Sequence, residues 1–132
     1  MFLVSKEFTF DAAHKLIHYH GKCERLHGHT YRLRVTIKGE KDEEGMVIDF
    51  ALLKKIVQKK VISVLDHSYL NDIINQPSAE NVAEWIWNQI EYLLDTPTHY
   101  LYEITLWETP TSFVTYRKDL SDKTHHSATS SR

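Results

Sequence analysis

The chain has 132 residues, 42% of them hydrophobic, which is enough for one domain with a buried core. Its formal charge of −2, from 16 basic and 18 acidic residues, argues against a dedicated nucleic-acid surface, which normally carries a basic excess. No run approaches the ~18 apolar residues of a membrane span, and the N-terminal segment lacks the apolar core of a signal peptide. A single cysteine cannot form an internal disulfide, so we expect a protein of the reducing cytoplasm.

Two stretches of alternating hydrophobicity predict half-buried strands near the N-terminus. Residues 2–14 carry apolar side chains at alternate positions, and His14 ends this series. The same alternation runs over residues 27–38, where His27 and His29 share a side with the larger apolar residues that follow. In both predicted strands, the histidines therefore lie on the same face as the apolar residues.

The rest of the chain predicts two helices followed by two strands. Asp49 is placed to cap a helix that runs to about Leu65, with apolar residues at helical spacing. A second helix is predicted to open at residues 77–78, and strand alternation returns over 100–108 and 113–117. The order β-β-α-α-β-β predicts an α+β fold, with a four-stranded antiparallel sheet and two helices on one face.

We expect residues 1–117 to form a single domain. Residues 118–132 are polar and rich in Ser and Thr, and they predict a disordered tail. A four-stranded sheet leaves two open edges, which neighbouring subunits can close.

Three of the histidines are placed to bind a metal ion. On a strand, His27 and His29 point to the same side with Cα atoms roughly 7 Å apart, which suits two imidazoles on one Zn²⁺. His14 shares the apolar face of its own strand, and Gly28 leaves room beside the metal. Each histidine alone is better explained as a hydrogen-bonded residue at the edge of a core. The three together predict a zinc site with one open position for water or substrate.

Cys23 lies in the polar connection that precedes His27, between Lys22 and Glu24. Cationic neighbours and a nearby metal lower the pKa of a thiol and raise its thiolate fraction, so we expect a catalytic role. Two alternatives stay open. A lone cysteine is often a small buried apolar residue, and here it could be a fourth ligand that makes the zinc site structural.

Asp66 and His67 follow the first predicted helix, and Glu108 continues the apolar parity of the strand at 100–108. A carboxylate that orients an imidazole makes a general base near neutral pH, although the same pair is ordinary at a helix end. A carboxylate on an apolar face is unusual without a partner. Glu108 could therefore anchor a heterocycle by accepting two N–H bonds, or it could turn into solvent before Pro110.

The chain resembles the 6-pyruvoyl-tetrahydropterin synthase/6-carboxytetrahydropterin synthase family in six segments, which follow one another over residues 2–117. These segments are FTFDAAH, GKCERLHGHTY, GMVIDF, LDHSYLN, PSAENVAEWIW and LWET. The three-residue gap between the cysteine and His-Gly-His resembles the 6-carboxytetrahydropterin branch, which serves queuosine and other 7-deazapurine synthesis. The pyruvoyl branch typically has a longer gap.

The resemblance implies a tunnelling fold (T-fold), whose subunits join edge to edge into a barrel, often as a hexamer made of two trimers. The implied zinc ligands are His14, His27 and His29. The implied proton-transfer residues are Cys23, Asp66 and His67, the last two supplied by a neighbouring subunit. The implied substrate-binding residues are Glu108, which would anchor the pterin, Ser78 and Glu80. Ser78 stands where the family often has threonine, and its hydroxyl is retained.

The implied reaction converts 7,8-dihydroneopterin triphosphate to 6-carboxy-5,6,7,8-tetrahydropterin with release of acetaldehyde and triphosphate. A pyruvoyl synthase would use the same substrate but eliminate triphosphate without cleaving a C–C bond. A zinc-stabilised interaction module, with Cys23 as fourth ligand, is the non-enzymatic alternative. Cupin oxygenases also carry His-x-His on a strand, but Leu33 and Arg34 stand where these have glutamate, so we discount that class.

Overall fold

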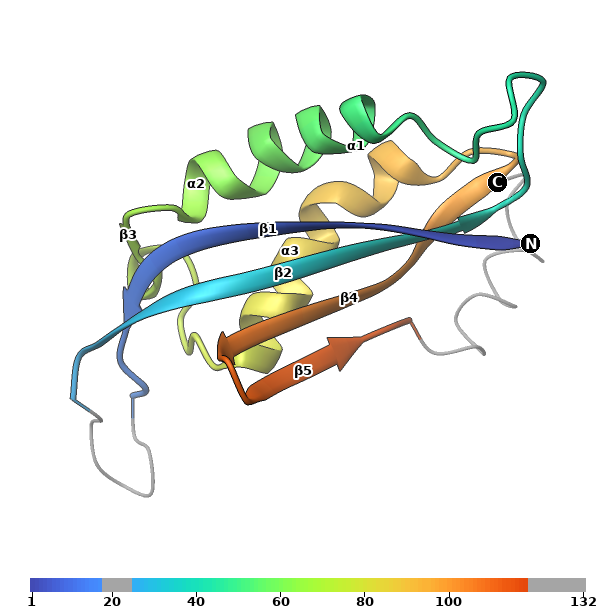
Figure 1. Ribbon diagram of the computed structural model, residues 1–132. Coiled ribbons are helices and arrows are strands. Elements are labelled where there is room, and N and C mark those ends of the chain that lie inside the picture. The colour runs from blue at the N-terminus through green and yellow to red at the C-terminus, as the bar shows by residue number, and fades with distance from the viewer. Residues whose placement is uncertain (18–24, 119–132) are drawn as a thin grey trace.

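The structure of the protein is a computed structural model that describes residues 1–17 and 25–118. In these ranges, five strands form one sheet in the spatial order β3-β1-β2-β4-β5 (Figure 1). The strands are β1 (Phe2–His14), β2 (His27–Gly39), β3 (Ser68–Tyr69), β4 (His99–Thr109) and β5 (Ser112–Tyr116). The helical segments are α1 (Phe50–Val57), the π-helical η1 (Gln58–Ile62), α2 (Ser63–Leu65), the short 3₁₀ helix η2 (Leu70–Asp72) and α3 (Ala79–Leu94).

The antiparallel pair of β1 and β2 is the longest element of the sheet. The two strands stay in register from Phe2 opposite Gly39 to His14 opposite His27. β4 pairs with the part of β2 that begins at Arg32, and β5 pairs with β4. The sheet therefore consists of four long or medium antiparallel strands, as the sequence predicts, with β3 added at the edge.

The helices cover one face of the sheet, and the core lies between them (Figure 1). Alternate side chains of β1 and β2, such as Phe10, Leu33 and Val35, are buried against apolar residues of the helices. Each fully buried side chain of this size contributes about 1.5–3 kcal/mol. No helix of the described residues covers the other face of the sheet (Figure 1), which carries most of the charged residues of β1 and β2, such as Glu7, Arg32 and Arg34.

Both long helices begin where the sequence predicts. The Asp49 carboxylate accepts a hydrogen bond from the Ala51 N–H at 2.9 Å, and the Ser78 hydroxyl accepts one from the Asn81 N–H at 3.2 Å. These caps satisfy N–H groups that lack a partner inside the helix. The first helix ends at Leu65 as expected, but its middle turn is η1, a π-helical segment that no local sequence signal indicated.

The main addition to the predicted architecture is β3. It lies in a segment expected to be a loop and pairs in parallel with Ala12 and Ala13 of β1. In the described part of the chain, β1 up to Asp11 therefore forms one open edge of the sheet and β5 forms the other. Open edges of this length are sites where another strand can pair.

None of the helices in residues 1–17 and 25–118 is long and apolar enough to span a membrane. Lys118 is described, and its Nζ lies 2.8 Å from Oε1 of Glu91 on α3. The remainder of the expected tail, residues 119–132, lies outside the described residues, so the domain boundary stays a prediction.

Candidate active site

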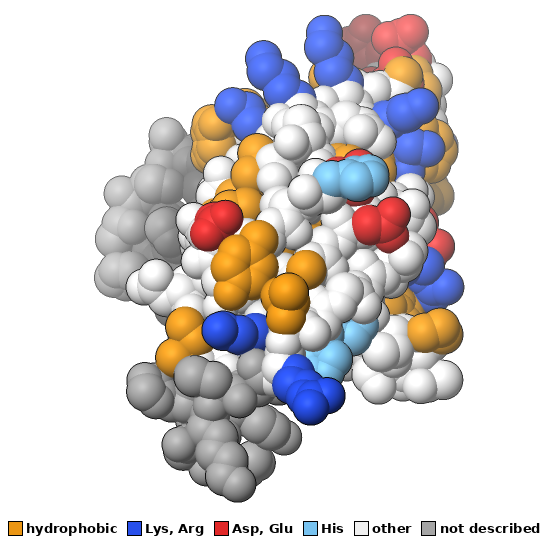
Figure 2. Space-filling view, turned by 90° about the vertical axis from the view of Figure 1, so that its left-hand side faces the viewer, with side chains coloured by type: hydrophobic (Ala, Val, Ile, Leu, Met, Phe, Trp, Pro, Cys, Tyr) orange, Lys and Arg blue, Asp and Glu red, His pale blue; other side chains and the backbone are white. Residues whose placement is uncertain are grey.

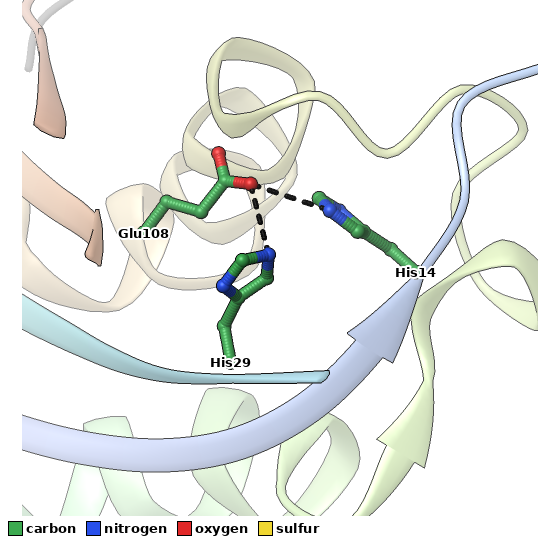
Figure 3. A group of neighbouring side chains, drawn as sticks. All are labelled: His14, His29 and Glu108. Carbon is green, nitrogen blue, oxygen red and sulfur yellow. Dashed lines mark ion pairs between the residues drawn. The ribbon is translucent and has the colours of Figure 1, made fainter. Parts of the chain in front are cut away.

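Two histidines and a glutamate converge at one end of the sheet. His14 ends β1, His29 lies on β2 opposite Ala12, and Glu108 lies near the end of β4. Nε2 of His14 is 3.3 Å from Oε1 of Glu108, and Nε2 of His29 is 3.2 Å from the same oxygen (Figure 3). Three strands thus bring together two imidazoles and a carboxylate.

The orientation of His14 is set by groups behind its ring. Its Nδ1 lies 2.9 Å from the carbonyl oxygen of Pro77, and because a carbonyl only accepts, Nδ1 carries the proton. Nε2 faces the cluster and, when it carries no proton, offers the lone pair with which imidazole binds a metal. The buried hydroxyl of Tyr31 lies 3.2 Å from the same Nδ1. Burial and the charge of Glu108 raise the pKa of Tyr31, so this hydroxyl stays protonated.

His27 is the third histidine of the group. It starts β2 opposite His14, and its ring centroid lies 6.4 Å from that of His14 and 6.1 Å from that of His29. The centroids of His14 and His29 are 5.1 Å apart. Three imidazoles on one tetrahedral zinc, with Zn–N bonds of ~2.0–2.1 Å, have centroids about 5 Å apart. The distances from His27 to the other two rings are longer than this spacing, so the place of His27 as the third zinc ligand stays a prediction.

A second ligand set is also present. The possible ligand atoms of His14, His29 and Glu108 all lie within 4.8 Å of one another, so two histidines and a carboxylate could hold a metal as well. Nε2 of His14 and Nε2 of His29 donate to this carboxylate oxygen when they carry protons, and they repel it when they carry lone pairs unless a cation lies among them. The hydrogen bond from His14 and the charges of the histidines lower the pKa of Glu108, whereas burial opposes this shift. The donor set fits a bound cation.

The cluster is reached where β2 and β4 separate. Their last paired residues are Arg32 and Trp107; beyond this point β2 continues beside β1 and β4 continues beside β5. A pocket of about 430 Å³ opens between the two strand ends, and Gly28, His29 and Glu108 are among the residues that line it. A Cβ atom at Gly28 would meet no atom within 4 Å, so a side chain would also fit there, and the room expected beside a metal stays a prediction.

The predicted pair of Asp66 and His67 forms a contact. Nδ1 of His67 lies 3.0 Å from Oδ2 of Asp66. The main chain of Asp11 holds both residues, because its N–H donates to Oδ1 of Asp66 at 2.9 Å and its carbonyl accepts from the His67 N–H at 2.6 Å. His67 has a φ of 60°, a left-handed conformation that is uncommon for a residue other than glycine. Since the helix ends at Leu65, the two side chains are free of helical spacing and can meet.

His67 of this pair lines a pocket together with His29 of the histidine cluster. A pocket of about 460 Å³ is lined by Asp11 and His67 on one side and by Gly28 and His29 on the other. Figure 2, which looks onto the end of the sheet that carries β3, shows histidine side chains at two separate places, with acidic side chains beside one of them. The Asp11 carboxylate also accepts a hydrogen bond from the Thr30 hydroxyl at 2.5 Å.

Two further predicted site residues, Ser78 and Glu80, lie at the start of α3. Ser78 caps α3, directly after the Pro77 carbonyl that holds His14, and Glu80 lies exposed in the first turn of that helix. Cys23 lies outside the described residues, so its place and role stay predictions.

Three contributors were not predicted from the sequence: the Pro77 carbonyl, the Tyr31 hydroxyl and Asp11. Tyr31 follows His29 by two positions on the same strand face, so strand alternation could have pointed to it. Pro77 and Asp11 act through their main chains. No side-chain pattern reveals the partner of a main-chain group across the fold.

Comparisons with known proteins agree with this geometry. The sequence model of the family described as 6-pyruvoyl tetrahydropterin synthase matches residues 3–119. A 6-carboxy-5,6,7,8-tetrahydropterin synthase of Haemophilus influenzae is 38% identical over 144 residues, covering 89% of this chain and 100% of the relative. One of Synechocystis is 40% identical over 123 residues, covering 88% and 93%. The human 6-pyruvoyl tetrahydrobiopterin synthase is 33% identical over 134 residues, covering 86% and 90%.

The solved structures support the same conclusion about the fold. The 6-pyruvoyl tetrahydropterin synthase of Caenorhabditis elegans superposes with a TM-score of 0.73 at 28% identity, covering 90% of this chain and 98% of that one. That of Plasmodium falciparum superposes with the same TM-score at 27% identity. The predicted T-fold is confirmed.

The buried Tyr31 hydroxyl generates a first prediction. Replacing Tyr31 by phenylalanine keeps the ring but removes the hydroxyl beside Nδ1 of His14, so we expect metal affinity to fall about tenfold with the fold intact. Competition with a chromophoric chelator measures the affinity. Tyr102→Phe is the matched control, because that hydroxyl contacts Arg117 instead. Equal affinities in both variants would contradict a role for Tyr31.

Asp66 generates a prediction about pH. The N–H of Asp11 lowers the pKa of Asp66 most, burial opposes this, and His67 lowers the pKa further. Because the folded-state pKa lies below the unfolded value of about 3.9, the charged form stabilises the fold above that pH. This contribution is lost as pH falls through the folded-state pKa. We therefore expect the urea midpoint of wild type to exceed that of Asp66→Asn at pH 7 and the difference to narrow below about pH 4. If the difference between the two urea midpoints did not change with pH, the stabilising role of the Asp66 charge would be contradicted.

Proposed function

We propose that this chain, which belongs to the 6-pyruvoyl tetrahydropterin synthase family, is a zinc-dependent 6-carboxy-5,6,7,8-tetrahydropterin synthase. The reaction converts 7,8-dihydroneopterin triphosphate to 6-carboxytetrahydropterin and releases acetaldehyde and triphosphate. The product enters queuosine or other 7-deazapurine synthesis in the cytoplasm. Two relatives with that synthase name are 38% and 40% identical, whereas the human pyruvoyl relative is 33% identical.

The observation that carries the proposal is the convergence of imidazole nitrogens beside Glu108. In the proposed site, His14, His27 and His29 hold the zinc ion and leave one position open. When bound, zinc polarises side-chain oxygens of the substrate and acidifies the adjacent O–H and C–H groups. The Pro77 carbonyl and the Tyr31 hydroxyl keep Nε2 of His14 directed at that ion.

Glu108 anchors the pterin in this proposal. A carboxylate accepts two parallel N–H bonds from a guanidine-like edge, and the lowered pKa of Glu108 keeps it ionised for this role. The place of Glu108 in the pocket between β2 and β4, beside His29, supports a position of the ring next to the proposed metal ligands. Ser78 and Glu80 are assigned a supporting role at the start of α3.

Two groups move protons. Cys23, four residues before His27 in sequence, acts as a thiolate on one face of the substrate. His67, with Nδ1 bonded to Asp66, offers Nε2 as the acid/base on the opposite face. We assign this pair to a neighbouring subunit, since the open edges of β1 and β5 allow chains to join edge to edge. The proposed assembly is a hexamer of two trimers.

The first test is the product. The zinc-loaded protein, incubated with 7,8-dihydroneopterin triphosphate, is expected to form 6-carboxytetrahydropterin and one equivalent of acetaldehyde, both measured by mass spectrometry after trapping. A pyruvoyl product without acetaldehyde would instead establish the pyruvoyl alternative. Protein stripped of metal and tested in parallel controls for uncatalysed breakdown.

The second test separates the enzyme from a zinc-stabilised interaction module. Cys23→Ala is expected to retain about one zinc per chain, measured by atomic emission, and to lower kcat by 10²-fold or more, as for loss of a general acid or base. Cys23→Ser, which keeps a weak donor, serves as a matched variant. Loss of zinc together with loss of the folded circular dichroism signal would favour the structural site.

A further inference from the structure

The pocket between the ends of β2 and β4 also contains a basic residue, Arg32, to which the proposed function assigns no role. Arg32 and Trp107 form the last pair of these strands and line the pocket, together with His29 and Glu108. The pocket thus has an acidic group near the metal ligands and a guanidinium group at the point where the strands part.

Arg32 is held in place by stacking rather than by a close ion pair. Its Cζ lies 3.7 Å from the centroid of the Trp107 ring, which fixes the plane of the guanidinium group. Nε of Arg32 is 3.7 Å from Oε1 of Glu7, which is beyond hydrogen-bond distance. Oε2 of the same glutamate lies 2.8 Å from both Nε and Nη2 of Arg34. Glu7 therefore neutralises Arg34 in preference to Arg32.

The pocket also offers hydroxyl groups beside the guanidinium group. Thr9, which faces Arg32 across β1 and β2, and Thr109 near the end of β4 both line it. A planar guanidinium group with hydroxyl donors is the arrangement that binds phosphate oxygens in two-bond geometry. Arg32 is about half exposed, so an anion can approach it without displacing the core.

From this geometry we infer that Arg32, oriented by Trp107, binds the triphosphate of the substrate and selects for the phosphorylated pterin. The inference rests on the proposed function. The substrate has an N–H-rich ring at one end and a polyanionic chain at the other. The pocket has the complementary order, with Glu108 for the ring and Arg32 for the chain, so the two charged groups set the direction in which the substrate lies.

Binding affinity tests this inference apart from turnover. Dissociation constants of 7,8-dihydroneopterin and of its triphosphate are measured by calorimetry on the full-length zinc-loaded chain in a His67→Ala background. This substitution is expected to arrest turnover and removes no residue that lines this pocket. The ratio of the two constants reports what the phosphates contribute.

We expect the triphosphate form to bind at least 100-fold more tightly than the unphosphorylated form. Arg32→Met, which keeps an apolar side chain over Trp107, is expected to reduce this ratio about 10- to 100-fold, the effect of one lost charge-assisted contact. For Arg32→Lys we expect a ratio between those of the native residue and of Arg32→Met, because lysine keeps the charge without the planar guanidinium group. Affinity for the unphosphorylated pterin should stay within about twofold.

Lys38→Met is the matched control. Lys38 is another cation of β2, and its Nζ lies 5.0 Å from the ring of Tyr102, outside this pocket. This variant should leave the ratio unchanged. A ratio that is insensitive to Arg32, or that falls equally with Lys38→Met, would overturn the inference and leave the proposed function standing. Failure of the His67→Ala chain with native Arg32 to bind either pterin would overturn both.

Discussion

The unbroken register between β1 and β2 is the constraint on which the site depends. It places His14 directly opposite His27 and Ala12 opposite His29, so that three imidazoles lie at one end of the sheet. Because side chains alternate between faces, a slip of one residue would turn β1 and its terminal histidine to the opposite face. The buried residues Phe8, Phe10, Tyr31 and Leu33 oppose such a slip, since it would expose their side chains. The hydrophobic core thereby positions the proposed metal ligands.

The sheet and the helical layer meet at His14. Its buried ring has Nε2 near Glu108 and Nδ1 near the carbonyl of Pro77, which lies one residue before the cap of α3. The start of that helix is therefore fixed relative to the end of β1, and the tautomer of the histidine follows from the same contact. The Pro77 carbonyl, far along the chain from His14, thus orients a proposed metal ligand without binding the metal itself.

The two candidate functional groups are held by different parts of β1, one by a core-facing side chain and the other by main-chain groups at the edge of the strand. His14 shares the core-facing parity of β1, whereas Asp11 belongs to the other parity and holds Asp66 and His67 through its main chain. Arg32 also lies on the face without helices, stacked on Trp107. The separation of β2 from β4 connects the two faces, because the pocket that opens there is lined by residues of both. The candidate site therefore lies at the ends of the strands and includes residues from both faces of the sheet.

Features with a local cause could be read from the sequence alone. The bounds of β1, the caps at Asp49 and Ser78, and the shared parity of His27 and His29 follow from alternation and from hydrogen bonds a few residues apart. The role of Cys23 stays a prediction, because it lies outside the described residues. The strand β3, the support of His14 by Pro77, the clamp of Asp11 on His67 and the stack of Arg32 on Trp107 came only from the tertiary structure. Each joins segments distant in sequence, often through main-chain atoms, and such contacts exist only once strand register and helix placement have been set by packing of the core.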